Sequence, residues 1–185
     1  MTPWHLRKAI HHLDQGEIIA YPTEGLYGLG CNPYDGQAVL QLLALKQRPL
    51  SRGLILIASH FDQLTPLLAT LPKNQAARVQ ASWPGPNTWV WPCVPEVPHW
   101  LSGGRDTLAV RVTAHPIAAA LCNAFGAPLV STSANLSGHP PAHTALDVHR
   151  IFSEEIDYIL HGDLSGTMQA TGIRDARTGQ VLRKG

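Results

Sequence analysis

The chain has 185 residues with 14 basic and 13 acidic side chains, and this length favours one domain spanning residues 1–185. Charged residues make up 15% and apolar residues 44%, which argues against a disordered chain, and the net charge of +1 argues against binding of nucleic acid by bulk charge. No stretch approaches the ~18 apolar residues of a membrane span, and the N-terminus lacks the apolar block of a signal peptide. We therefore expect a cytoplasmic protein that does not bind membranes.

Helices and short apolar strands alternate along the chain. Apolar residues at helical spacing predict a helix over 3–15, and short apolar runs predict strands over 17–21 and 26–29. Asp35 is a candidate N-cap for a helix that runs to Lys46, and a strand is expected over 54–58. Helices follow over 61–71 and 74–81, strands over 89–94 and 108–112, a helix over 115–125, a strand over 129–131, a helix over 144–152, and strands over 156–160 and 180–183. Continuous apolar strands between helices indicate an α/β layer fold whose sheet is covered on at least one face.

The few charges are unevenly distributed. Residues 36–95 hold five bases and one acid, a net charge of +4, whereas residues 147–175 hold two bases and six acids, a net charge of −4. Lys46, Arg48 and Arg52 lie within seven residues, where a helix gives way to a Pro-containing loop, and could form a cradle for phosphate. Lys46 and Arg48 could equally cap the C-terminus of that helix and complement its dipole.

Polar residues are concentrated after one predicted strand. Residues 131–138 supply hydroxyl and amide groups where α/β proteins bind small polar ligands, although a turn that satisfies its own backbone is equally consistent. Arg111 lies inside an apolar strand, so its guanidinium must reach solvent or hold a buried anion. The glycines of 25–30 fit neither common nucleotide-binding pattern, because no Lys-Ser/Thr follows them and Pro33 stands where the dinucleotide pattern needs its last glycine.

Six blocks in order resemble the YrdC-like family and are closest to its short form: YPTEGLYGLG (21–30), KQRP (46–49), WPGPNT (83–88), LAVRV (108–112), STSANLSG (131–138) and LRKG (182–185). The resemblance covers about residues 18–185 and leaves no residues for the additional C-terminal domain of longer members. It implies a single α/β domain with a twisted open sheet, mixed and mostly parallel, surrounding helices and a large concave basic pocket. The implied reaction joins L-threonine, bicarbonate and ATP to give threonylcarbamoyl-AMP and diphosphate. The product would serve the N6-threonylcarbamoyladenosine modification of tRNA.

The same resemblance implies two sides of one pocket. Its threonine side would comprise Thr23, Arg111, Ser133 and Thr171, with Arg111 suited to grip a carboxylate through two hydrogen bonds. Its ATP side would comprise Lys46, Arg48, Arg52, Thr88, Asn135 and Arg183. Lys46 and Arg48 would be the catalytic residues, because their charge can neutralise the leaving diphosphate.

ATP is expected as a substrate, and Mg²⁺ is expected to arrive with its phosphates, because no carboxylate cluster in the sequence suggests a metal site. Three widely spaced cysteines do not suggest one, and neither do His139 and His143, which two prolines separate. The expected partners are L-threonine, bicarbonate, possible tRNA, and other proteins of the tRNA threonylcarbamoylation pathway.

Two other functions stay open at this point. A basic concave face could bind tRNA or double-stranded RNA without chemistry of its own, and the +4 segment favours this alternative. A carbamoyl-transfer or hydrolase accessory protein could use the same pocket. The enzyme is favoured because polar pocket motifs outnumber the exposed aromatic residues expected of a single-strand binder.

Overall fold

The computed structural model describes residues 1–166 and 169–185, and within them nine strands form one sheet. The strands are β1 (Ile19–Pro22), β2 (Tyr27–Gly30), β3 (Ile55–Ala58), β4 (Asn87–Pro92), β5 (Thr107–Val112), β6 (Leu129–Ser133), β7 (Tyr158–Ile159), β8 (Gly172–Asp175) and β9 (Val181–Arg183). Their order across the sheet is β7-β1-β2-β6-β3-β5-β4-β8-β9. The α/β architecture expected from the sequence is thereby confirmed.

The sheet is mixed, but the expectation that it is mostly parallel is wrong. The pairs β1/β7, β3/β5 and β4/β8 are parallel, and the five other neighbouring pairs are antiparallel. A strand that is buried on both faces is a continuous apolar run whichever direction its neighbours take. Apolar runs alone therefore could not distinguish the two directions.

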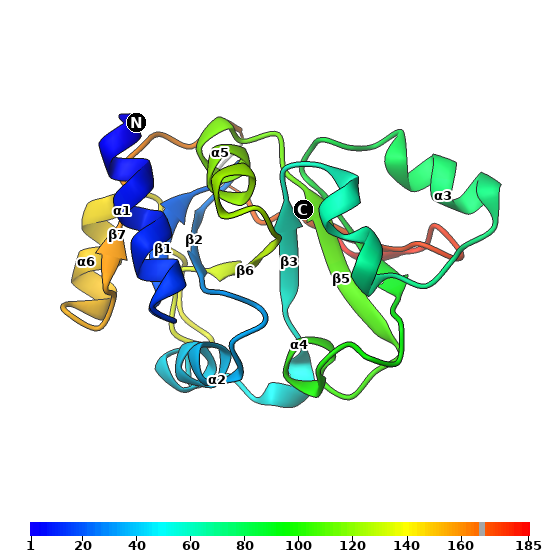
Figure 1. Ribbon diagram of the computed structural model, residues 1–185, viewed down its shortest axis with the longest axis horizontal. Helices are drawn as coiled ribbons and strands as arrows, with labels where there is room; N and C mark the ends of the chain where they lie inside the picture. Colours follow the sequence, from blue (N-terminus) through cyan, green and yellow to red (C-terminus); the bar gives the residue numbers. More distant parts are fainter. Residues whose placement is uncertain (167–168) are drawn as a thin grey trace.

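Helices cover both faces of the sheet. They are α1 (Pro3–Asp14), α2 (Gly36–Leu45), α3 (Lys73–Gln80), α4 (His99–Ser102), α5 (Pro116–Phe125) and α6 (Ala145–Phe152). Figure 1 shows α5 above β6, α2 and α4 below it, and α1 beside β1 at the left. Alternate strand residues serve the two faces, since Ile57 packs with α1 and α5 whereas its neighbours Leu56 and Ala58 pack with α2 and α4.

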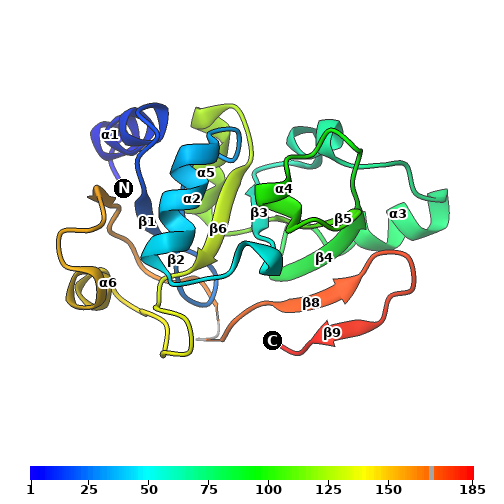
Figure 2. The ribbon, with the colours of Figure 1, turned by 90° about the horizontal axis from the view of Figure 1, so that it is seen from below.

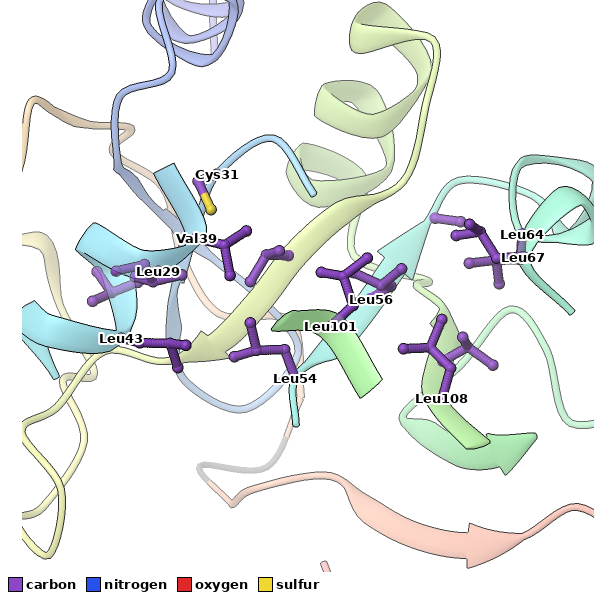
Figure 3. Close-up of a cluster of buried hydrophobic side chains, with 14 of the residues drawn as sticks. Leu29, Cys31, Val39, Leu43, Leu54, Leu56, Leu64, Leu67, Leu101 and Leu108 are labelled. Atoms are coloured by element: carbon purple, nitrogen blue, oxygen red, sulfur yellow. The ribbon is translucent and has the colours of Figure 1, made fainter. Parts of the chain in front are cut away.

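The hydrophobic cluster between the sheet and the helices α2 and α4 holds the start of β3 in place. The start of β3 borders the candidate site described below. Figure 3 shows Leu54 and Leu56 of this segment packed with Leu43 of α2, Leu101 of α4 and Leu108 of β5. Each fully buried leucine side chain stabilises the fold by roughly 1.5–3 kcal/mol relative to an exposed one. The backbone that follows α2 is thus held firmly against the sheet.

Local signals placed most elements correctly; the exceptions are the helix expected over 61–71 and two elements that were not predicted, α4 and β8. Asp35 caps α2 as expected, because its Oδ1 accepts hydrogen bonds from the backbone N–H groups of Gln37 and Ala38 at 2.9 and 3.1 Å. The helix expected over 61–71 is wrong: this segment forms two short 3-10 turns, η2 (Phe61–Gln63) and η3 (Thr65–Leu67). Pro66 lies in the second turn and has no N–H to donate, so a continuous helix cannot pass through it.

The C-terminal hairpin of β8 and β9 was only half expected, because no strand was predicted over 172–175. The hairpin extends the sheet beside β4 (Figure 2), through a parallel pairing of β8 with β4. It carries Arg183 toward the middle of the molecule, where the candidate site lies. Among the described residues, no helix is long and apolar enough to cross a membrane.

Candidate active site

Most of the side chains expected to bind ligands lie around one cavity. It lies where the segment 23–28, the end of β6, the start of β3 and residues 169–171 meet, and its empty volume, including the part open to solvent, is about 690 Å³. Six of the ten expected residues line it: Thr23, Arg48, Arg111, Ser133, Thr171 and Arg183. The fold therefore unites groups that are far apart in the sequence.

Arg111 of β5 forms a buried ion pair at the edge of this cavity. Its Nη2 lies 3.4 Å from Oε2 of Glu24, and the two residues are only 5% and 6% exposed. Oε1 of Glu24 accepts hydrogen bonds from the Thr113 hydroxyl at 2.8 Å and from the Ala114 backbone N–H at 3.0 Å. The buried anion that an arginine in an apolar strand requires is thus supplied by the protein itself.

Part of the hydrogen-bonding capacity of this ion pair is unused. Within residues 1–166 and 169–185, Arg111 Nε and Glu24 Oε2 are buried and have no hydrogen-bond partner. A guanidinium has five N–H donors, so the contact with Glu24 leaves donors that a carboxylate in the cavity can accept. Glu24 was not among the expected site residues, although the need of Arg111 for a buried carboxylate was a signal that could have found it.

Lys46 lies behind the cavity wall and organises the loop after β6. Its Nζ donates hydrogen bonds to Ser133 O at 2.5 Å, to Asn135 O at 2.6 Å and to Asn135 Oδ1 at 3.2 Å. These three oxygens use all three donors of an ammonium group. The Ser133 hydroxyl donates to the same Asn135 Oδ1 at 2.6 Å. Lys46 therefore fixes the position of Ser133, and a direct contact with a ligand would cost it one of these bonds.

Burial shapes the acid–base behaviour of Lys46. Desolvation, followed by the nearby positive charge of Arg48, lowers the pKa of Lys46 to about 8. Lys46 is also the C-cap residue of α2, directly after Leu45. Its ammonium nevertheless bonds to the loop after β6, so neither a helix cap nor a direct phosphate cradle describes its contacts.

A second cavity adjoins the first and is lined by arginines. Its empty volume, again including open solvent, is about 820 Å³; it shares Arg48 and Arg183 with the first cavity and adds Arg52 and Arg105. No carboxylate is found in its described lining. The pKa of Arg48 is lowered, first by burial and then by the charges of Arg52, Arg183 and Arg105. This end of the site carries positive charge that the described side chains do not neutralise.

Two of the remaining expected residues support the cavity from behind. Thr88 of β4 is fully buried, and its hydroxyl lies 3.2 Å from that of Thr171. Arg183 Nη2 donates to Thr171 O at 2.8 Å, which ties β9 to the segment before β8. Asn135 does not line the cavity, and its side-chain amide donates to His139 O at 2.6 Å. Thr88 and Asn135 thus hold Thr171 and Ser133 in place.

A metal cage is not found in the part of the chain that the structure describes, since no three His, Cys, Asp or Glu side chains there are grouped to hold an ion. Glu24 is a carboxylate beside the cavity, but Arg111, Thr113 and Ala114 already engage it.

Sequence comparison relates the chain to a known family. The model of the Sua5/YciO/YrdC family, described as "telomere recombination", matches residues 11–185. The threonylcarbamoyl-AMP synthase of Halorhodospira halophila is 55% identical over 182 residues, which cover 98% of this chain and 95% of that protein. The threonylcarbamoyl-AMP synthase of Vibrio parahaemolyticus is 49% identical over 183 residues, which cover 98% and 99% of the two chains.

Structural comparison gives the same relationship. Sua5 from P. abyssi complexed with L-threonine is 35% identical and superposes with a TM-score of 0.88, covering 95% of this chain but 52% of that longer chain. YciO from E. coli is 28% identical and superposes with a TM-score of 0.86, covering 97% and 88% of the two chains. The fold is therefore shared with two longer proteins.

Proposed function

The chain belongs to the Sua5/YciO/YrdC family, and from that premise we propose that it synthesises threonylcarbamoyl-AMP from L-threonine, bicarbonate and ATP. One observation carries the proposal beyond the likeness. A cavity with hydroxyl groups and Arg111 at one end continues into a cluster of arginines without a carboxylate in its described lining. The first end suits a ligand with one carboxylate, and the second suits a polyphosphate.

The reaction requires the protein to align its substrates and does not require a covalent intermediate with the protein. The ammonium group of threonine first loses a proton to solvent. The resulting amine then attacks the carbon of bicarbonate, with loss of water, and becomes a carbamate. A carbamate oxygen then attacks the α-phosphorus of ATP, forming a new P–O bond, and the bond to the bridging oxygen breaks so that diphosphate leaves with the electron pair. Rate enhancement then depends on holding two anions in line and on neutralising the charge that grows on the leaving group.

The threonine side is assigned to groups that can still accept or donate. The unpaired edge of Arg111 would hold the carboxylate. The Thr23 hydroxyl donates to Leu26 O at 2.7 Å and the Ser133 hydroxyl donates to Asn135, so both oxygens would accept hydrogen bonds from the substrate. Thr171 lines the same cavity and completes this side.

The nucleotide side is assigned to the arginines. Arg48 and Arg183 line both cavities, and Arg52 lines the second, so the three would hold the phosphates and neutralise the leaving diphosphate. Arg48 is proposed as the catalytic residue among them. The sequence also predicted Lys46 as a catalytic residue. Lys46 would act by holding Ser133 and Asn135 in position and by adding positive charge behind them.

The wider setting follows from the reaction. Mg²⁺ would enter with the phosphates of ATP and be held largely by them. The product would pass to tRNA through other proteins of the threonylcarbamoylation pathway. A cytoplasmic location is part of the proposal, because ATP and tRNA meet there.

The direct test is incubation with ATP, L-threonine and bicarbonate, followed by mass detection of threonylcarbamoyl-AMP and quantification of diphosphate. We expect diphosphate release that depends on threonine and that is lost in Arg48→Ala and Arg111→Ala. Arg177→Gln is the matched control, because Arg177 lies outside both cavities and pairs with Asp106 on the surface. A protein that binds tRNA but releases no diphosphate would be an RNA-binding module, and the synthase proposal would be wrong.

A further inference from the structure

Arg105 lies beside the proposed nucleotide side and has been given no role so far. It follows α4 and precedes β5, is exposed, and lines the second cavity. Its guanidinium donates hydrogen bonds to Ser51 O at 2.7 Å and to Ser102 O at 3.5 Å. Arg105 thus spans from its own loop to the short turn η1 (Leu50–Arg52), which carries Arg52.

Two glycines bring these loops into direct contact. Gly53 and Gly103 have φ of +63° and +67°, a left-handed conformation that glycine adopts without strain. A Cβ on Gly103 would lie 2.7 Å from Gly53 N, and a Cβ on Gly53 would lie 3.1 Å from Arg105 Nη1. Larger residues would therefore force the loops apart and move Arg105 away from the cavity.

Because of this close approach, the guanidinium groups of Arg48 and Arg105 both lie beside Gly53. Arg48 Nη2 donates to Gly53 O at 2.9 Å, while Arg105 Nη1 lies on the side of the same glycine where a Cβ would project. With Arg52 and Arg183, four arginines line the second cavity. Within residues 1–166 and 169–185, no ion pair involves any of the four. Like charges at short range repel, so this arrangement is most stable with a polyanion between them.

We propose that Arg105 binds the diphosphate end of the nucleotide, together with Arg52, and so is a further substrate-binding residue. The inference rests on the proposed function for the identity of the anion. The anion itself is required by the charge of the second cavity, whatever reaction follows. Because Arg105 reaches the cavity from the side of η1 and α4, it would contact the outer phosphates and leave the α-phosphate to the groups of the first cavity.

The experiment is calorimetric titration of the full chain with inorganic diphosphate and, separately, with AMP, in the absence of threonine and bicarbonate. One charge-assisted contact is worth about a factor of ten or more in affinity, so Arg105→Gln should weaken diphosphate binding about tenfold. AMP carries only the α-phosphate, so its affinity should change less than about twofold. Arg177→Gln, which removes the same charge from the neighbouring surface pair with Asp106, should leave both affinities unchanged.

A purely structural role of Arg105 predicts a different result. If Arg105 only tied η1 to α4, Arg105→Gln would disturb Arg48 and Arg52 together and weaken both ligands alike; that result, or no change in either, overturns the proposal. Should Arg105→Gln not fold, Arg105→Lys decides, with an expected loss of about threefold for diphosphate and none for AMP. No titration requires catalysis, so a chain that binds diphosphate through Arg105 but makes no threonylcarbamoyl-AMP contradicts the proposed function alone.

Discussion

Glu24→Gln isolates the charge of the buried ion pair at the edge of the cavity. A glutamine keeps an oxygen in the position of Oε1, so the bonds from the Thr113 hydroxyl and the Ala114 N–H can persist. The substitution removes the negative charge that lies 3.4 Å from Arg111 Nη2. Arg111 is only 5% exposed, so its guanidinium cannot reach solvent without moving the surrounding residues. The substitution therefore leaves a buried cation without its counter-charge.

The size of the effect follows from this geometry. Breaking a buried ion pair by removing one partner costs about 3–5 kcal/mol. The pair here is joined by a single contact at 3.4 Å, longer than a well-aligned charged hydrogen bond, and Arg111 borders a cavity that is open to solvent. We therefore expect Glu24→Gln to lower the free energy of unfolding by about 2–3 kcal/mol at pH 7.

Urea unfolding of four proteins tests this reasoning: the wild type, Glu24→Gln, Arg111→Met and the double variant. Because the double variant buries no unpaired charge, it should be more stable than the sum of the two single losses predicts, by at least 1 kcal/mol as an approximate threshold. Thr113→Ala serves as the control for loss of one hydrogen bond, about 1 kcal/mol. A loss below about 0.5 kcal/mol in Glu24→Gln, or strict additivity, would refute the ion-pair account.

Four further outcomes are expected. The kcat/KM for ATP should fall as pH rises past about 8, where Lys46 loses its proton and one donor to the 133–135 loop, and Lys46→Met should lack this step. The pKa of Lys46 in the folded protein lies below the ordinary value of 10.5, so between pH 8 and 10.5 the unfolded chain binds more protons than the folded one. The free energy of unfolding of the wild type, relative to that of Lys46→Met, should therefore rise over this pH range when measured by urea unfolding. Ser133→Ala should lower kcat/KM for threonine about tenfold with little change in thermal midpoint, and steady-state kinetics at unchanged KM and kcat would contradict its role. Serine should be used about 10- to 100-fold less well than threonine in a competition assay, because its missing methyl leaves an apolar gap, and equal rates would contradict that.

Elements with strong local signals were predictable from the sequence. Asp35 accepts hydrogen bonds from the first turn of α2, which begins at the next residue, as expected. The helix expected over 144–152 begins one residue later, at Ala145, because Thr144 is its N-cap. Strand direction was not predictable, because it depends on pairings between distant segments. The strand β8 was missed because its side chains are only partly buried, so no apolar run marks it.

The site divides in the same way. The residue types that line the cavity were predictable from short blocks, and six of ten do line it. Their contacts were not, because the partners are distant in the chain: Lys46 bonds to residues 133 and 135, and Arg111 pairs with residue 24. A local pattern shows that a buried charge needs a partner, but only the fold determines which residue provides it.

The charge of +1 now has a physical interpretation. Arg111 is neutralised by Glu24, whereas no ion pair among the described residues neutralises Arg48, Arg52, Arg105 or Arg183. In the proposed reaction, threonine enters as a zwitterion of zero net charge and ATP as a polyanion. A neutralised arginine suits the first ligand, because it offers directional donors without a strong attraction for any anion. An uncompensated cluster suits the second, because the charge of the leaving diphosphate grows beside it, so the electrostatic stabilisation is largest where the bond breaks.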